Sequence, residues 1–306
     1  MHSGRAAYLK LLNSVNYYRT DVLIIGADIT GKLLVPIIEA HDGYRYTYRG
    51  RNETVEVSRL QKVRDALQDE GVYTSVVSQE EYESIRNQPE KIDALFRKAM
   101  AETLESWAKL AQERLSPKGI RVIVNFGNDD RRDLDEHIND IENDSFVFAE
   151  DRIITLGDTY QLISTGYANK TPWDAPRDVT EEELAVIIEK KVEPLQSFDT
   201  AIFNFHCPPY DTPLDRAVML DPDGKLRGGA GHSRTAPVGS TAVRKAIEKY
   251  QPLLGLHGHI HESRGYCKIG RTVCLNPGSE YQNGVLKFCL IVLDGSSVKR
   301  YNFIDG

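Results

Sequence analysis

Four apolar runs of strand-forming residues each end in side chains that can bind a metal ion, and this pattern constrains the fold most. The runs are VLIIGAD, RVIVNFGN, TAIFNFH and LLGLHGH, and they lead to Asp28, Asn128, His206 and the pair His259 and His261. Helical stretches separate them, so the chain is expected to form α/β layers. Because sites in open α/β sheets collect at the carboxyl ends of strands, these side chains are expected to converge.

The types of these side chains indicate what they bind. Imidazoles combined with a carboxylate and an amide oxygen suit divalent cations such as Mn, Fe, Zn or Ni, and one carboxylate can bridge two of them. Taken singly, Asp28 could form an ordinary turn and His206 could be a satisfied core histidine. His259 and His261 are more specific, because imidazoles two residues apart at a strand end face the same way. The ordered set therefore predicts a site for two divalent metal ions.

The same motifs, in this order, resemble those of the calcineurin-like metallophosphoesterase superfamily. The matching segments are Gly26-Ala27-Asp28, Gly127-Asn128-Asp129-Asp130, Phe205-His206 and Gly258-His259-Ile260-His261. Together they extend from the first strand to the last third of the chain, and the Gly-Asn-Asp-Asp form marks a subgroup. The resemblance implies one domain over residues 1–306, with a four-layer α-β-β-α sandwich around a dinuclear metal site.

The resemblance also implies a role for each matched residue. Asp28 would bridge both metals, and His261 would bind one of them. The ligands of the other would be Asn128, His206 and His259. A metal-bridging hydroxide would attack phosphorus, so the expected activity is metal-dependent hydrolysis of a small phosphomonoester or phosphodiester. The alternative is a non-catalytic scaffold or binding protein that kept this fold while its metal site decayed.

The N-terminal end departs from the family pattern. The family begins with a strand followed by Asp-x-His, whereas this chain begins Met1-His2-Ser3-Gly4 and continues into a stretch with helical periodicity. The spacing from His2 to Asp28 fits the histidine of that motif, and the motif's aspartate would fall before Met1. We therefore expect His2 to be a metal ligand, the first strand to be missing, and binding at that metal to be weak. The alternative is that His2 is a disordered terminal residue.

Several further residues are candidates for catalysis or substrate binding. Asp129 stands where the family usually has a histidine, and a carboxyl group donates a proton only when its pKa is raised. We therefore expect Asp129 to be a weak general acid. His257 is expected either to orient a ligand or to pack within its strand. Arg131 and His232 could bind substrate phosphate, although an exposed charge pair and a solvated loop are the more ordinary explanations.

Residues 41–118 are predicted to be an insertion into this domain. Within them, residues 44–57 alternate in polarity around a turn, which predicts a hairpin. The stretch 89–115 repeats apolar residues every three or four positions, which predicts a long amphipathic helix. Because neither is needed for the metal core, we expect the insertion to form a lid or an oligomer contact. Just before it, 32–40 is predicted to be a helix that Pro36 kinks or delays.

Composition narrows the class of protein and its partners. A net charge of −7 argues against a broad DNA-binding face, so a nuclease of the same superfamily is the weaker hypothesis. The longest apolar runs are far below the roughly 18 residues of a membrane span, and no signal peptide is evident. The four cysteines show no disulfide spacing. We therefore expect a cytoplasmic protein that acts on a small phosphorylated substrate and can assemble as a homo-oligomer.

Overall fold

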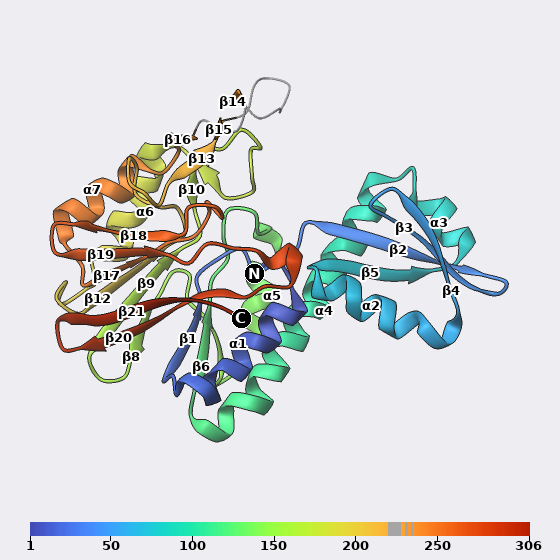
Figure 1. Cartoon of the computed structure of the whole chain (residues 1–306), viewed down its shortest axis with the longest axis horizontal. Helices are drawn as coiled ribbons and strands as arrows, with labels where there is room; N and C mark the ends of the chain where they lie inside the picture. The colour runs from blue at the N-terminus through green and yellow to red at the C-terminus, as the bar shows by residue number, and fades with distance from the viewer. Residues whose placement is uncertain (220–227, 230–231, 234) are drawn as a thin grey trace.

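Two β-sheets form the body of the molecule, which is a mixed α/β fold (Figure 1). The structure is a computed structural model, and it describes residues 1–219, 228–229, 232–233 and 235–306. The first sheet has three parallel strands in the order β1 (Val22–Ile25), β6 (Arg121–Val124) and β7 (Phe146–Phe148). The second has the order β18 (Gly265–Ile269), β19 (Thr272–Asn276), β17 (Leu254–Leu256), β12 (Ala201–Phe205), β9 (Tyr160–Thr165) and β8 (Ile153–Leu156).

Apolar side chains of the two sheets pack together and form the central core. Ile123 of β6 is fully buried in one cluster with Leu162 of β9, Ile202 of β12 and Leu254 of β17. Strands buried on both faces have continuous apolar sequences, which is why these runs stood out. Strands β1 and β6 run parallel, as do β9, β12, β17 and β19, so within each sheet their carboxyl ends share an edge.

Helices cover each sheet on the side away from this core. Helices α1 (Arg5–Tyr18) and α4 (Pro89–Leu115) share a buried cluster with the first sheet, where the rings of Tyr8 and Trp107 stack 4.2 Å apart. Helices α6 (Glu181–Val192) and α7 (Thr241–Tyr250) pack on the second sheet. The prediction of a helix at 89–115 is confirmed, but this helix packs in the core of the body, contrary to the expectation that the metal core does not need it. The other helical segments of the body are η2 (Ser116–Lys118), η3 (Arg132–Leu134), α5 (Asp135–Asp140) and η4 (Tyr281–Asn283).

A smaller lobe projects from the body and contains the predicted hairpin (Figure 1). Its sheet has the order β4 (Arg51–Val55), β3 (Gly43–Tyr48), β2 (Leu33–Ala40) and β5 (Val72–Val77). The turn η1 (Val57–Arg59) leads into α2 (Leu60–Asp69), which contacts β5, and α3 (Gln79–Ile85) contacts β2. The hairpin at 44–57 is therefore confirmed as β3 and β4.

The helix predicted at 32–40 is wrong, because these residues form the strand β2. Val35 and Ile37 are both buried and lie two residues apart. This is the period of a strand, which the helical interpretation overlooked. A proline inside a helix would remove a hydrogen bond and clash with the preceding turn. In the sheet, β3 pairs with β2 only over Ile38–Ala40, so Pro36 has a partner strand on one side only. Strand prolines are tolerated at such positions.

The C-terminal hairpin of β20 (Lys287–Asp294) and β21 (Ser297–Asp305) is a separate two-stranded sheet. Three short pairs complete the strands: β10 (Ala168–Asn169) with β11 (Asp178–Val179), β13 (Arg216–Val218) with β16 (Thr235–Pro237), and β14 (Gly228–Gly229) with β15 (His232–Ser233). Among the described residues, no helix has both the length and the apolar character that crossing a membrane requires.

Candidate metal centre

The carboxyl ends of four strands bring the predicted metal ligands together. Asp28 follows β1, Asn128 follows β6 and His206 follows β12. Nε2 of His206 lies 3.1 Å from Oδ2 of Asp28 and 3.0 Å from Oδ1 of Asn128. Nδ1 of His259, which follows β17, lies 3.0 Å from the same Asn128 oxygen. These four residues from four separate strand ends therefore direct their donor atoms at one another.

A second group of donor atoms shares Asp28. His2, Asp28 and His261 each offer one ligand atom, and these atoms all lie within 4.8 Å of one another. The Nε2 atoms of His2 and His261 are 3.2 Å apart, and Nε2 of His2 is 3.7 Å from Oδ2 of Asp28. His2 is fully buried, its ring lies against Tyr281, and its backbone N–H donates to the carbonyl of Asp28 at 2.8 Å. Asp28 therefore lies between two groups of donors.

The backbone at three of these residues adopts the left-handed region, which residues other than glycine rarely occupy. The φ angle is 46° at His2, 50° at Asp28 and 63° at His259. Such strain costs of order 1–3 kcal/mol and collects at functional sites, where the surrounding structure holds it. Gly127 allows the close approach of the two loops, because a Cβ there would lie 2.1 Å from Oδ1 of Asp28. The backbone at this edge of the sheet is therefore held in a strained conformation that positions the ligands.

Asp28 and His206 form a buried charge pair. Burial opposes the charge on Asp28, but the charge and hydrogen bond of His206, with His2 and His259, hold the pKa of Asp28 well below its ordinary value. Burial lowers the pKa of His206, but the charge and hydrogen bond of Asp28, together with the charges of Asp129 and Asp130, raise it, so the net shift is upward. The pocket is therefore arranged to hold an ionised Asp28 next to positive charge. A divalent cation would supply that charge in place of the imidazolium.

The remaining histidines of the site are neutral. Burial lowers the pKa of His259 to about 3 and that of His261 to about 4, and it lowers the pKa of His2 as well. Neutral imidazoles offer lone pairs to a cation, and Nδ1 of His2 is buried with no hydrogen-bond partner among the described residues. Imidazole nitrogens, a carboxylate and an amide oxygen that face one another fit a first-row divalent cation. The site can therefore hold a metal ion.

Asp130, the last residue of the Gly-Asn-Asp-Asp motif, ties the two ligand-bearing loops together. Its buried carboxylate accepts hydrogen bonds from the backbone N–H groups of Ile29, Thr30 and Gly127, at 3.0, 2.8 and 2.7 Å. Burial and the charge of Asp28 raise its pKa to about 6, against the effect of these hydrogen bonds. Asp130 therefore fixes the loop of Asp28 against the loop of Asn128.

Sequence reasoning missed Lys32, whose ammonium group forms an ion pair with Asp129 beside the site. Burial lowers the pKa of Lys32, but Asp129 and Asp28 raise it more, so the side chain is a cation. For Asp129, burial and the charge of Asp28 raise the pKa, and Lys32 opposes this shift. No motif marked Lys32, because its approach to Asp129 depends on how the chain enters the lobe.

The three lesser candidates lie in different surroundings. Arg131 forms ion pairs with Asp93 and Asp133 on the surface, which is the ordinary explanation that the sequence offered. Nδ1 of His257 lies 2.8 Å from a backbone carbonyl at the end of β12, and its Nε2 has no hydrogen-bond partner in the described part of the chain. His232 belongs to β15, but its side chain lies outside the described residues.

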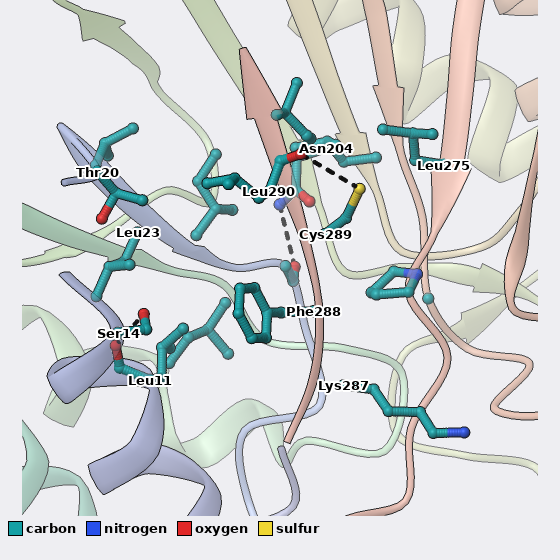
Figure 2. A pocket seen from close by; sticks show the side chains of 18 of the residues that line it. Leu11, Ser14, Thr20, Leu23, Asn204, Leu275, Lys287, Phe288, Cys289 and Leu290 are labelled. Atoms are coloured by element: carbon teal, nitrogen blue, oxygen red, sulfur yellow. Dashed lines mark hydrogen bonds between the residues drawn. The ribbon is translucent and has the colours of Figure 1, made fainter. Parts of the chain in front are cut away.

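A cavity of about 980 Å³ extends from the metal centre between β1 and β20. Figure 2 shows apolar side chains around it, among them Leu11 of α1, Leu23 of β1, and Phe288 and Leu290 of β20. Over the described residues, β1 and β20 each pair with one strand only, so each has an edge without a strand partner. Such edges leave backbone N–H and C=O groups without their usual partners.

Comparison with known proteins adds little to this geometry. No family model matches the sequence. The uncharacterized protein MJ1162 of Methanocaldococcus jannaschii is 33% identical over 160 residues, which are 52% of this chain and 64% of that protein. One crystal structure has 15% identity and a TM-score of 0.48 over 89% of this chain and 94% of its own. Another, TT1561 of Thermus thermophilus, has 13% identity and a TM-score of 0.43 over 67% and 79%. The chain therefore spans less than two thirds of the curated relative, whose name states no activity.

Proposed function

We propose that this protein is a phosphoesterase that hydrolyses a small phosphomonoester or phosphodiester at a centre of two divalent metal ions. The observation that carries the proposal is the position of Asp28 between two groups of donor atoms. One group would be the ligands of one metal, namely Asn128, His206 and His259. The other group is His2 and His261. A scaffold protein that binds no metal would not need five further side chains of metal-ligand type around a strained aspartate.

Bound divalent cations would supply Lewis acidity and a lowered pKa for water at this centre. The chain's own residues would provide the rest. Asp28 is ionised and the surrounding imidazoles of His2, His259 and His261 are neutral, so two divalent cations would leave the centre positively charged. A positive, partly enclosed centre attracts an anionic phosphate ester.

Lys32 is proposed to bind the substrate at the rim of the centre. Its side chain is 53% exposed, and its ammonium group is held beside the metal ligands by Asp129. An ammonium group at this place can donate hydrogen bonds to phosphoryl oxygens or to the oxygen of the leaving group. Asp129 would then act mainly by positioning Lys32, in agreement with the expectation that it is a weak general acid.

The layers of the body support the four-layer α-β-β-α sandwich of the metallophosphoesterases as the finer description of the fold. Helices α1 and α4, the first sheet, the second sheet, and helices α6 and α7 follow one another through three buried clusters. In the described part of the chain, β1 and β20 each have an unpaired edge at the cavity, and one more strand would join these two edges. We propose that this is the place of the first strand in that family.

The segment 41–118 is proposed to be an insertion that acts as a lid or an oligomer contact. Its strands and its helices α2 and α3 belong to the lobe, whereas α4 packs against the body. Lys32 stands directly before the lobe, so movement of the lobe would change the surroundings of the substrate. We also propose that the protein is cytoplasmic, where its four cysteines would stay reduced.

Turnover of an aryl phosphodiester and an aryl phosphomonoester, with added Mn²⁺ and with a chelator, tests the proposal. We expect turnover to require Mn²⁺ and to fall to the chelated level in His259→Ala, because this change removes one imidazole ligand. His41→Ala replaces an exposed histidine of the lobe and should keep wild-type turnover. Failure to bind Mn²⁺, together with no turnover of either ester, would favour the scaffold whose metal site decayed. Turnover unaffected by chelator and by His259→Ala would contradict a metal-dependent enzyme.

A further inference from the structure

We infer that Asp178 is a positioning residue that decides which end of the Asn128 amide faces the metal centre, an inference that rests on the proposed function. The two ends of an amide have nearly the same shape but opposite chemistry, since the oxygen can bind a cation and the NH₂ group cannot. Asn128 is 2% exposed, and its Oδ1 lies 3.0 Å from a ring nitrogen of both His206 and His259. Its role as a ligand therefore requires a contact that prevents the amide from turning over.

Asp178 makes that contact on the far side of the amide. Nδ2 of Asn128 donates to Oδ1 of Asp178 at 3.0 Å. The other carboxylate oxygen accepts from the backbone N–H groups of Thr171 and Ala175, at 2.9 and 3.0 Å, and from the Thr171 hydroxyl group. An ionised carboxylate only accepts hydrogen bonds, so the NH₂ end of Asn128 must face it. The oxygen end must then face the histidines.

The carboxylate is carried on a segment that is fixed to the same loop. The backbone N–H of Arg177 donates to the carbonyl of Asn128 at 3.1 Å. The Arg177 side chain, whose residue is 1% exposed, donates to the carbonyls of Asp130 and Arg131 at 3.1 Å each. Strand pairing of β11 with β10 holds Asp178 from the other direction. Asp178 is therefore positioned by backbone contacts that do not depend on a metal.

Asp178→Asn is the variant that tests orientation with the least change of shape. The new side chain can still accept from Thr171 and Ala175 through its oxygen, and its NH₂ group then faces Asn128. Only the oxygen of Asn128 can accept from that NH₂, so the amide of Asn128 should turn its own NH₂ toward the metal. We expect Mn²⁺ affinity, measured by calorimetry, to fall by about 10–100-fold. The urea midpoint should stay close to that of the wild type.

Asp135→Asn is the matched control. Asp135 forms an ion pair with Arg177 on the other side of the loop, and no hydrogen bond joins it to Asn128 among the described residues. Mn²⁺ affinity should therefore stay within about twofold of the wild type. An equal loss of affinity in Asp135→Asn and Asp178→Asn would show that general support of the loop, not orientation of the amide, is what matters, and would overturn the inference.

Combining Asp178→Asn with Asn128→Asp should reverse the direction in which Asp178→Asn changes Mn²⁺ affinity. A loss of loop support alone would not cause this reversal. A carboxylate at 128 can bind a cation with either oxygen, but it faces the negative charge of Asp178. Asp178→Asn removes that repulsion and offers an NH₂ group. It should therefore raise Mn²⁺ affinity in the Asn128→Asp background while lowering it in the wild-type background. A loss of similar size in both backgrounds would overturn the inference.

The side-chain NH₂ signals of Asn128, observed by NMR in chelated protein, test the orientation without metal. They are identified by their absence from the Asn128→Asp spectrum, and we expect them to exchange slowly in the wild type and to shift in Asp178→Asn. Unshifted signals would overturn the inference even if the protein binds Mn²⁺. Failure of the wild type to bind Mn²⁺ would instead overturn the proposed function, and the metal-free signals would still decide the orientation of the amide.

Discussion

The body and the lobe are both built from helices and β-sheets, but they differ in how many apolar side chains each buries. The sheets of the body are covered by helices and share a central core. In the lobe, the buried apolar cluster is Val35, Leu67 and Val72, and helix α3 has no buried residue. Every proposed metal ligand belongs to the body, whereas Lys32 stands at the entrance to the lobe. The proposed metal ligands, which must keep fixed distances from one another, therefore lie in the densely packed body. The proposed substrate contact, Lys32, lies at the border between the body and the lobe.

Deleting residues 41–118 is expected to have the largest effect, because this segment contains elements of both regions. Its helix α4 contributes Met100, Leu104 and Trp107 to the core of the body. Without them, α1 and the first sheet would expose a large apolar surface, and the body should fail to fold. Circular dichroism and urea titration would show this. A folded deletion variant that still binds Mn²⁺ would mean that the body does not need α4 to fold.

Leu104→Ala and Leu67→Ala compare the two cores directly. Leu104 is 1% exposed in the body and Leu67 is 5% exposed in the lobe. A buried Leu→Ala change costs about 2–5 kcal/mol, depending on how far the surroundings can collapse around the cavity. We expect Leu104→Ala near the upper end and Leu67→Ala near the lower end, measured by urea unfolding. Equal costs would mean that the lobe is packed as tightly as the body.

Lys32→Met tests the border between the two regions. It keeps a long side chain but removes the charge that pairs with Asp129. We expect KM for a phosphate ester to rise about tenfold, which corresponds to about 1.4 kcal/mol, with Mn²⁺ affinity unchanged. Arg86→Met, in the lobe, removes an exposed cation paired with Glu83 and serves as the control. A matching loss of Mn²⁺ affinity in Lys32→Met would place the lysine's role in the metal centre instead.

The smallest expected effects come from two capping boxes, one in each region. Thr180 caps α6 in the body and Ser78 caps α3 in the lobe, each with a glutamate three residues later. Replacing either with alanine removes a hydrogen bond to the N-terminus of a helix, at a cost of about 1 kcal/mol. Thr180→Ala should lower global stability by that amount. Ser78→Ala should mainly reduce hydrogen-exchange protection within α3, and a full global loss would show that the lobe unfolds together with the body.

The extent of sequence-based prediction also differs between the two regions. Both ends of helix α4 could be predicted from the sequence. A long stretch with helical periodicity that begins at a proline is compatible with few other structures. The strand β2 was predicted as a helix, since its alternation is short and Pro36 suggested a helix start. Strands β5 and β18 went unpredicted, because short runs of mixed polarity acquire their structure from neighbouring strands.

The sequence by itself determined which residues are available as ligands and in what order, because each follows an apolar strand. It could not determine their distances, which depend on two sheets meeting at one edge. Only the tertiary structure buried His2 beside His261, brought Lys32 to Asp129, and placed Asp178 behind Asn128 from 50 positions away. The physical reason is that strand periodicity is a local property, whereas the orientation of a ligand is set by hydrogen bonds between segments distant in the chain.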